Sequence, residues 1–424
     1  MKKILFLLLV IILIVGGYYY YNNIYLPSLI PAIETEKNKV TVSKYYIYGT
    51  HLNIEGNIKR INAKFKDIDL ILWNPKIGKS TKYKINYSKN INAVSFNISD
   101  EINNGIYLDN ISKGSYELYL RFTYINKKEK KYKYYPLNND TDYNKTTYYT
   151  TSKHNNKITI FKNGTTMTMK VKNNTDKGIY DVVIDPACGG IDKGVNGNGH
   201  YESDIAMDYA IKLKDKLDAK GIRVKLTRKK DSLGDNEYFD EYNDGGRAVI
   251  SNEVHAKYLF SLSANSSTKR DTRGFEIYTA VGINYDFITN MSKSIISKTT
   301  MPTSPSTYNR IDYGIYSHNF NEIEIRENMA YYKSKGYKKY NVTTNSNYLY
   351  MIRESGGIIT GAYVDESNPE KVGVNKYYNS NVGTEAYVIK LGYLTNQEDI
   401  SIITTKIDDY VDSISNSIIE ELKD

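Results

Sequence analysis

The chain opens with a continuous apolar stretch between a charged start and an aromatic end. Two lysines at positions 2 and 3 precede the apolar residues 4–17, and four tyrosines fill positions 18–21. This order is typical of an export signal, and a helix through Tyr21 would be about 27 Å long, close to the thickness of a bilayer core. No small-residue cleavage pattern follows. We therefore expect residues 1–23 to be an uncleaved signal anchor of a single-pass membrane protein, with the rest of the chain outside the cytoplasmic membrane; a cleaved signal peptide is the alternative.

Residues 40–172 have alternating apolar and polar positions, with turn residues between short runs. In Tyr116–Phe122 the even-numbered residues are apolar or aromatic, which predicts a strand buried on one side. Further on, Asn163 and Gly164 separate two such runs and predict a tight hairpin. The spacing of the runs predicts an all-β domain of the immunoglobulin-like sandwich type. The function of this domain cannot be inferred from its sequence.

The pattern changes after Gly178, where continuous apolar strands alternate with helical repeats. Residues 172–177 are rich in Asn, Asp and Lys and predict a linker. The alternation predicts an α/β domain over residues 178–424, with three layers and a mainly parallel or mixed sheet. The expected strands are 181–184, 223–227, 258–262 and 386–391, and the expected helices are 202–220, 247–253, 286–298 and one closing helix from Ile407 to Leu422.

Composition limits the possible chemistry. Lysine and arginine number 57 against 48 acidic residues, and the net charge of +9 suggests an anionic partner, such as a cell-wall polymer, rather than nucleic acid. The single cysteine, Cys188, excludes a disulfide framework and any zinc site built from cysteine pairs. A metal site in this chain would need histidine and carboxylate ligands, and the chain has five histidines.

Several spaced segments from Asp181 onward resemble the zinc-dependent N-acetylmuramoyl-L-alanine amidases, which cut the bond between the glycan and the stem peptide of peptidoglycan. Each segment is a weak signal alone, but all of them occur in the family's order. The segments are V-V-I-D-P-A-C-G-G at 182–190, Glu202, L-T-R at 226–228 with Asp231, Arg247 with S-N at 251–252, S-L-S-A-N at 261–265, G-F-E-I-Y at 274–278 and L-G-Y-L-T-N at 391–396. The resemblance implies the α/β amidase fold.

The resemblance also implies which positions would carry the family's chemistry. Amidases of this family hold one zinc with two histidines and a glutamate, and a late glutamate handles protons. The two histidine positions correspond to Cys188 and Ser263, the glutamate ligand to Glu202, and the late glutamate to Lys390. Only Glu202 keeps the family's residue type.

The three replacements differ in what they could still do. A Cys188 thiolate could bind zinc, but a serine hydroxyl is a poor zinc ligand and a lysine ammonium cannot accept a proton. We therefore expect zinc to be absent, Ser263 to be a lost ligand position and Lys390 to be non-catalytic. With no metal, Lys390 is predicted to approach Glu202, directly or through one water, and to replace the cation electrostatically. Cys188 would then be a neutral liner and Ser263 a hydrogen-bonding filler.

Three readings of the function remain open. The first is a pseudoenzyme of the cell envelope that binds peptidoglycan or an envelope protein, with Asp185 and Asn265 in its pocket. The second is an active zinc amidase whose metal site is rebuilt from Cys188 and Glu202, with or without His200. The third is an adhesion or scaffold protein that acts through the β-sandwich. The segment 301–381 is expected to lie near the pocket.

Overall fold

The structure is a computed structural model that describes most of the chain. The described residues are 2–20, 40–48, 50–59, 61, 64–90, 93–98, 105–126, 129–138, 145–164, 166–190, 192–229, 246–281, 283, 285–305, 309–335, 342–356 and 384–423. The motif residue Asp231 and, in the segment 301–381, residues 306–308, 336–341 and 357–381 lie outside these ranges.

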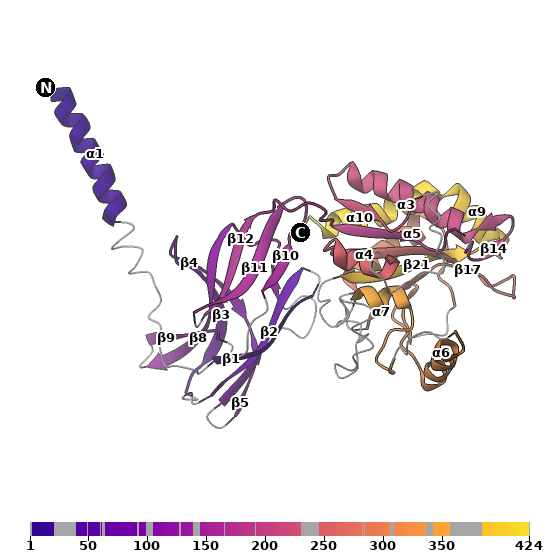
Figure 1. The fold of residues 1–424 in the computed structure, drawn as a ribbon, viewed down its shortest axis with the longest axis horizontal. Coiled ribbons are helices and arrows are strands. Elements are labelled where there is room, and N and C mark those ends of the chain that lie inside the picture. The colour runs from indigo at the N-terminus through magenta and orange to yellow at the C-terminus, as the bar shows by residue number, and fades with distance from the viewer. Residues whose placement is uncertain are drawn as a thin grey trace.

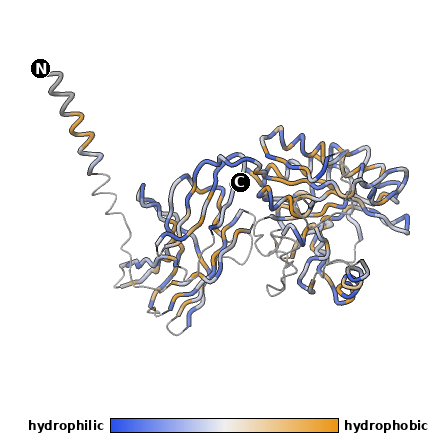
Figure 2. The backbone as a smooth tube through the Cα atoms, in the orientation of Figure 1, coloured by the Kyte–Doolittle hydropathy of each residue, from blue (hydrophilic) through white to orange (hydrophobic). Residues whose placement is uncertain are grey.

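The N-terminal apolar run is helical. Helix α1 covers Lys2–Tyr20, and its middle is strongly hydrophobic (Figures 1 and 2). Among the described residues, however, no helix meets the combined length and hydropathy required for a membrane span. The predicted helix is therefore present, whereas its role as a membrane anchor is not confirmed.

The next domain is all-β, as predicted, and is built from two sheets. One sheet has the order β1-β2-β6-β5 with β7 paired to β2, and the other has the order β10-β11-β12-β8-β3-β4 with β9 paired to β8. Apolar side chains from both sheets, such as Ile54 and Leu120, share one buried cluster. These sheets have five and seven strands, whereas a constant-type immunoglobulin sandwich has four and three, so the immunoglobulin-like assignment is not confirmed. The strands are β1 Val40–Tyr48, β2 His51–Lys59, β3 Asp67–Asn74, β4 Lys79–Lys84, β5 Asn86–Asn90, β6 Ala93–Asn97, β7 Ile106–Tyr107, β8 Gly114–Asn126, β9 Glu129–Pro136, β10 Thr146–Tyr149, β11 Asn156–Asn163 and β12 Thr166–Asn173.

The hairpin between β11 and β12 forms one residue later than predicted. Asn163 is itself paired with Thr166, so it belongs to the ladder and not to the turn. Gly164 has φ +61° and supplies the left-handed conformation that the turn needs. The predicted turn chemistry is thus correct for Gly164, but Asn163 ends the strand.

The domain over residues 178–424, called the C-terminal domain below, is a three-layer α/β structure (Figure 1). Its mixed sheet has the order β16-β13-β17-β21-β18-β20-β19, parallel from β16 to β21 and antiparallel between β21 and β18. Helices α3, α5 and α10 pack on one side, and α4 and α7 on the other. The elements are β13 Val182–Pro186, β14 Asn196–Gly197, β15 His200–Tyr201, α3 Glu202–Asp218, β16 Val224–Leu226, α4 Arg247–Glu253, β17 Tyr258–Asn265, β18 Glu276–Tyr278, α5 Asp286–Thr299, β19 Asn309–Arg310, β20 Ile315–Ser317, α6 Glu322–Lys335, α7 Tyr350–Gly356, β21 Glu385–Tyr393, α9 Gln397–Thr405 and α10 Ile407–Glu421.

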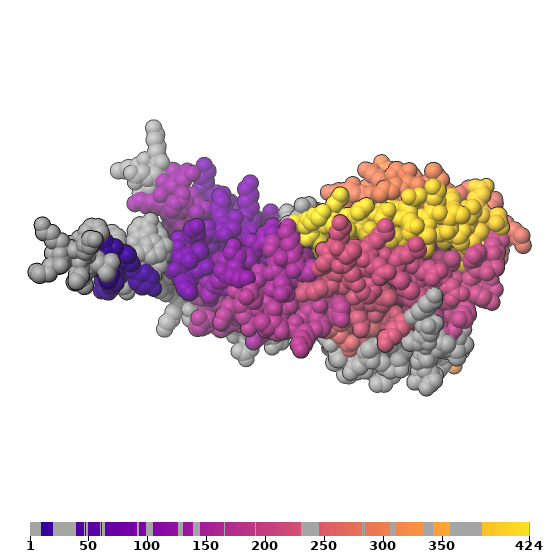
Figure 3. Space-filling view, turned by 90° about the horizontal axis from the view of Figure 1, so that it is seen from above, coloured from indigo at the N-terminus to yellow at the C-terminus, as the bar shows by residue number. Residues whose placement is uncertain are grey.

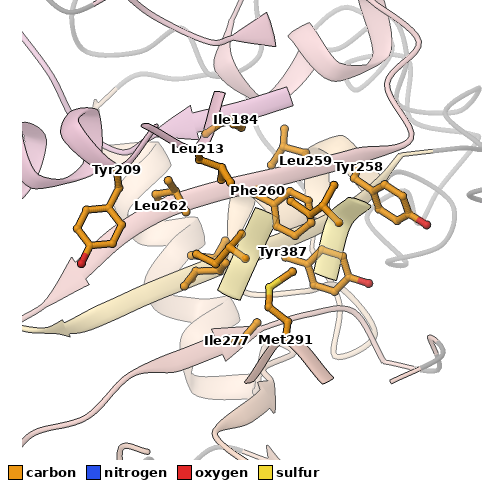
Figure 4. Packing of buried hydrophobic residues seen from close by; sticks show 14 of the residues in the cluster. Ile184, Tyr209, Leu213, Tyr258, Leu259, Phe260, Leu262, Ile277, Met291 and Tyr387 are labelled. Atoms are coloured by element: carbon orange, nitrogen blue, oxygen red, sulfur yellow. The ribbon is translucent and has the colours of Figure 1, made fainter. Parts of the chain in front are cut away.

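The core of this domain lies on both faces of the central strands. Phe260 on β17 stacks on Tyr387 of β21, with ring centroids 5.3 Å apart, and Phe287 of α5 packs edge-on against Tyr387. Figure 4 shows Phe260 and Tyr387 with Met291 and Ile277 nearby. Strands covered on both faces read as continuous apolar runs in the sequence, which is why their positions could be predicted.

The described part of the segment 301–381 extends the sheet. Strands β19 and β20 lie beyond β18, and helix α7 packs against β21 and α4. The Ser355 hydroxyl on α7 donates to the carbonyl of Ala248 on α4. This part of the segment is therefore a structural component of the domain, and its predicted proximity to a pocket stays a prediction.

Candidate functional site

The positions implied by the family resemblance gather where the parallel strands end. Cys188 follows β13, Ser263 lies near the end of β17 and Lys390 lies on β21. Ser263 and Lys390 are directly paired across β17 and β21, and Lys390 is paired with Glu276 on β18. Glu202 is the first residue of α3, immediately after the short hairpin β14–β15. The carboxyl ends of parallel strands are where α/β folds place their sites.

Glu202 is buried, and backbone N–H groups satisfy both of its carboxylate oxygens. Oε1 accepts from the N–H of Ala264 at 2.9 Å, and Oε2 accepts from the N–H of Val195 at 3.0 Å. In return, the Glu202 N–H donates to the Val195 carbonyl at 2.8 Å. A carboxylate with two N–H donors at a helix N-terminus is stabilised without any metal or side-chain cation.

Lys390 does not form the predicted ion pair. It is half-buried, and no salt bridge within 4.0 Å joins it to Glu202 in the described structure. The direct form of the predicted contact is therefore wrong, and the form through one water stays a prediction. Glu202 has two backbone N–H donors where the lysine was expected. Lys390 is still close enough to the site to stabilise the thiolate form of Cys188 electrostatically.

Cys188 lies in a strained, crowded turn. Its φ is +59°, a left-handed backbone conformation that residues other than glycine rarely adopt. Burial, together with the negative charges of Glu202 and Asp192, raises the pKa of its thiol to about 12. Without a metal the thiol is therefore protonated at neutral pH, which is unfavourable for a nucleophile. The role of Cys188 as a neutral liner stays a prediction.

The Gly-rich loop fills the space between Cys188 and Glu202. A β-carbon on Gly194 would lie 2.5 Å from Glu202 Oε2 and 2.6 Å from Cys188 Sγ. Only glycine fits there, because the backbone approaches both side chains and has φ +65°. The loop backbone thus packs directly against two of the positions that would bind zinc in the family.

Ser263 is buried, and its hydroxyl has no hydrogen-bond partner among the described residues. The predicted hydrogen-bonding filler thus makes no hydrogen bond to a described protein group, and its role as a filler stays a prediction. A buried hydroxyl without a partner costs free energy. Because it has no access to solvent, Ser263 is also unsuited to act as a nucleophile.

Taken together, these residues do not fit a zinc ion. Ser263 offers only a neutral hydroxyl, which is a poor zinc ligand, and the Lys390 ammonium near Cys188 has no lone pair to offer a metal. Within the described ranges, no three His, Cys, Asp or Glu side chains come together in a way that could hold a metal. His200, the proposed replacement ligand, lies on β15 and belongs to no such group.

Asp185, assigned to the pocket from the sequence, is completely buried beneath it. Its carboxylate accepts from the Arg247 guanidinium at 2.6 and 2.5 Å, from Ser261 Oγ at 2.6 Å and from Thr227 Oγ1 at 2.7 Å. Burial alone would raise the pKa of this carboxyl, but Arg247 and the two hydroxyls lower it below its ordinary value. This network joins β13, β17, α4 and the turn after β16. Asn265, the other pocket residue, is half-buried at the end of β17.

Two functional candidates were not recognised from the sequence. Glu276 lies directly opposite Lys390 on the neighbouring strand, and its carboxylate accepts from the hydroxyls of Tyr278 at 2.8 Å and Tyr393 at 3.0 Å. The buried ion pair between Arg247 and Asp185 is the other feature that was not recognised. Both residues lie in the quoted motif segments, so the signal was present, but a motif does not tell which side chains meet.

The comparison with known families agrees with this fold. The family described as N-acetylmuramoyl-L-alanine amidase matches residues 182–423, which is more than half of the chain, and the chain belongs to this family. No curated protein matches the chain.

Similar solved structures are amidases from several bacteria. The amidase AmiC2 of Nostoc punctiforme is 18% identical, with 59% of this chain and 99% of that chain covered and a TM-score of 0.37. The catalytic domain of CwlV from Bacillus (Paenibacillus) polymyxa is 20% identical, with 58% and 99% covered and a TM-score of 0.37. The CwlD amidase of Clostridioides difficile, solved in complex with the GerS lipoprotein, is 15% identical, with 57% and 98% covered and a TM-score of 0.38.

Replacing Glu202 with alanine should destabilise the protein even without any metal. The change leaves the buried Ala264 N–H and the Val195 N–H without their acceptor, at a cost of about 1–3 kcal/mol in the free energy of unfolding. Asp204→Ala is the matched control, because Asp204 is an exposed acid in the same first turn of α3. Urea unfolding of both variants measures the difference. Equal losses for the two variants would show that the amide contacts of Glu202 contribute nothing.

Proposed function

We propose that this chain is a cell-envelope protein whose amidase-like domain binds peptidoglycan without hydrolysing it. One observation carries the proposal: Glu202 is the only family ligand that is retained, and no group of three His, Cys, Asp or Glu side chains that could hold a metal forms around it among the described residues. The residues at the other family positions support it. A buried serine hydroxyl is a poor zinc ligand, and a lysine ammonium can neither bind zinc nor accept a proton.

We also propose that the chain acts outside the cytoplasmic membrane, held there by its N-terminal segment. The support is the sequence order of two lysines, an apolar run and four tyrosines. The net charge of +9 fits a surface that meets anionic wall polymers.

Zinc content tests the inactive site. Purified full-length protein is incubated with excess zinc, passed through a desalting column and analysed by atomic emission. We expect well under about 0.1 zinc per chain, since no donor set is available. About one zinc per chain, together with stem-peptide release that Glu202→Ala abolishes, would overturn the proposal and support an active amidase with a rebuilt site.

Sedimentation with purified insoluble peptidoglycan tests the binding. The full-length protein should sediment with the polymer, and Lys390→Glu should weaken sedimentation because Lys390 lies at the site. Lys216→Glu is the control, since Lys216 lies on α3 and pairs with Asp412 of α10, away from the strand ends. Failure of the unmodified protein to sediment would reject wall binding and favour an envelope protein as the partner. Equal sedimentation of both variants would reject this site as the binding surface and direct attention to the β-sandwich.

A further inference from the structure

The β-sandwich and the C-terminal domain meet at a buried lysine. Lys257 lies immediately before β17 and is 2% exposed, although it carries an ammonium group. Its partners all belong to the β-sandwich: Asp109 at 3.3 Å, the Tyr148 hydroxyl and the Tyr149 carbonyl at 2.5 Å. The ammonium also lies 3.7 Å from the centre of the Tyr148 ring. Two separate segments of the sandwich therefore bind the ammonium group of Lys257, which belongs to the C-terminal domain.

A second group of contacts lies beside the first. Asp181, just before β13, accepts from the Ser152 N–H of the sandwich at 3.1 Å and forms an ion pair with Arg223 at 2.6 Å. Arg223 in turn donates to the Thr150 carbonyl of the sandwich at 2.9 Å. The two domains have separate hydrophobic clusters, and the contacts between them combine these polar groups with ring packing between Tyr149 of the sandwich and His255 of the C-terminal domain.

This joint resists sliding and rotation. A buried ammonium needs a negative partner and hydrogen-bond acceptors in specific directions, and displacement by a few ångströms would remove them while water is still excluded. A joint of apolar side chains could slide with less loss, because hydrophobic contact has little directionality. The Lys257 contacts therefore select a single arrangement of the two domains.

The joint lies at the opposite end of the sheet from the candidate site. Lys257 and Asp181 precede β17 and β13, whereas Ser263 and Cys188 lie at or beyond the other ends of these strands. The six steps along the chain from Lys257 to Ser263 span about 20 Å of strand. Figure 1 shows β14, which is next to the site, at the end of the domain farthest from the sandwich, and Figure 3 shows the two domains end to end.

We infer that the β-sandwich is a rigid strut that holds the candidate site at the distal end of the molecule, facing away from the sandwich. Its role is then to orient the C-terminal domain and not to cover or complete the site. The inference goes beyond the proposed function and does not depend on it, because it concerns only the geometry between the two domains. It assigns a role to the domain whose sequence indicated none.

Distance measurements between spin labels test the strut. Cysteines replace the exposed residues Lys79 on β4 and Lys298 on α5, in a Cys188→Ala background of the full-length chain, and both are labelled. Pulsed electron resonance should give one narrow distance distribution. A broad or multiple distribution in this protein would overturn the inference without any further variant.

A second comparison tests the cause of the rigidity. Lys257→Met keeps the apolar stem over Tyr148 but removes the ammonium, and should broaden the distribution at least about two-fold. Lys153→Met is the matched control, because Lys153 makes only an exposed interdomain hydrogen bond to the Lys423 carbonyl, and it should leave the distribution narrow. An unchanged distribution in folded Lys257→Met, with folding checked by circular dichroism, would show that Lys257 does not fix the joint. Since neither zinc nor peptidoglycan is involved, failure here is independent of failure of the proposed function.

Discussion

Replacing Arg247 with methionine is expected to lower the free energy of unfolding by about 3–5 kcal/mol, the usual cost of removing one partner of a buried ion pair. Arg247 is 6% exposed, Asp185 is fully buried, and the guanidinium donates two hydrogen bonds to the carboxylate. Ser261 and Thr227 would remain as donors, but the carboxylate would lose its directly paired cation and keep only the weaker electrostatic interaction with Arg228. Urea unfolding at neutral pH measures the loss.

The pH dependence of this variant provides an internal check. Burial without Arg247 would raise the pKa of the Asp185 carboxyl, so the carboxyl becomes neutral at a higher pH than in the unmodified protein. The stability deficit of Arg247→Met should therefore shrink as the pH falls and Asp185 becomes protonated. Lys216→Met, which breaks the exposed pair with Asp412, should cost no more than about 1 kcal/mol. A loss for Arg247→Met as small as this control would contradict the importance of the buried pair.

The elements of the C-terminal domain could be predicted because their patterns are strong and local. Helix α4 begins and ends where the sequence indicated, and β13, β17 and β21 cover the predicted apolar runs. Strands buried on both faces have few polar residues, and helices that pack on them have apolar residues at four-residue spacing. Boundaries were less accurate: α3 ends at Asp218 and not at residue 220, and β13 covers Val182–Pro186 and not residues 181–184. Helix α9, which precedes the predicted closing helix, was not predicted.

The contacts of the site could not be predicted, because they depend on long-range approach. The sequence identified Glu202 and Lys390 and their opposite charges, and from these the ion pair was inferred. It did not reveal that the loop at Gly194 would bring the Val195 N–H to Glu202 from one side while β17 brings the Ala264 N–H from the other. Backbone donors carry no sequence signature, so the sequence does not show that they donate to Glu202 where a lysine side chain was expected.

The domain joint was missed for a related reason. Lys257 precedes an apolar strand, a position that ordinarily predicts a solvated charge at a strand end. Its burial follows from Asp109 and Tyr148, which lie more than one hundred residues earlier in the chain. A lysine is fully buried only when it is paired, and the pairing belongs to the tertiary structure.

Glu385 at the start of β21 should make the protein less stable as the pH rises. This carboxyl is buried, it accepts a hydrogen bond from the Tyr387 hydroxyl, and Tyr258 donates to the neighbouring Glu421 at 3.3 Å. Burial, with a smaller contribution from the negative charge of Glu421, raises the pKa of Glu385 from its ordinary value of 4.5 to about 8. At neutral pH the folded protein therefore keeps a proton that the unfolded chain has released.

The sign of the effect follows from this difference in bound protons. Below pH 4.5 both states are protonated and Glu385 causes no loss, whereas between pH 4.5 and 8 its contribution to stability falls by about 1.4 kcal/mol per pH unit. Glu385→Gln keeps an acceptor for Tyr387 and cannot ionise, so it should match the unmodified protein near pH 4 and exceed it by roughly 3–5 kcal/mol near pH 8. Urea midpoints measured across this range, with the exposed Asp412→Asn as control, give the two curves. Parallel curves for Glu385→Gln and the unmodified protein would mean that Glu385 ionises normally, and that the strand end beside Lys257 is open to water.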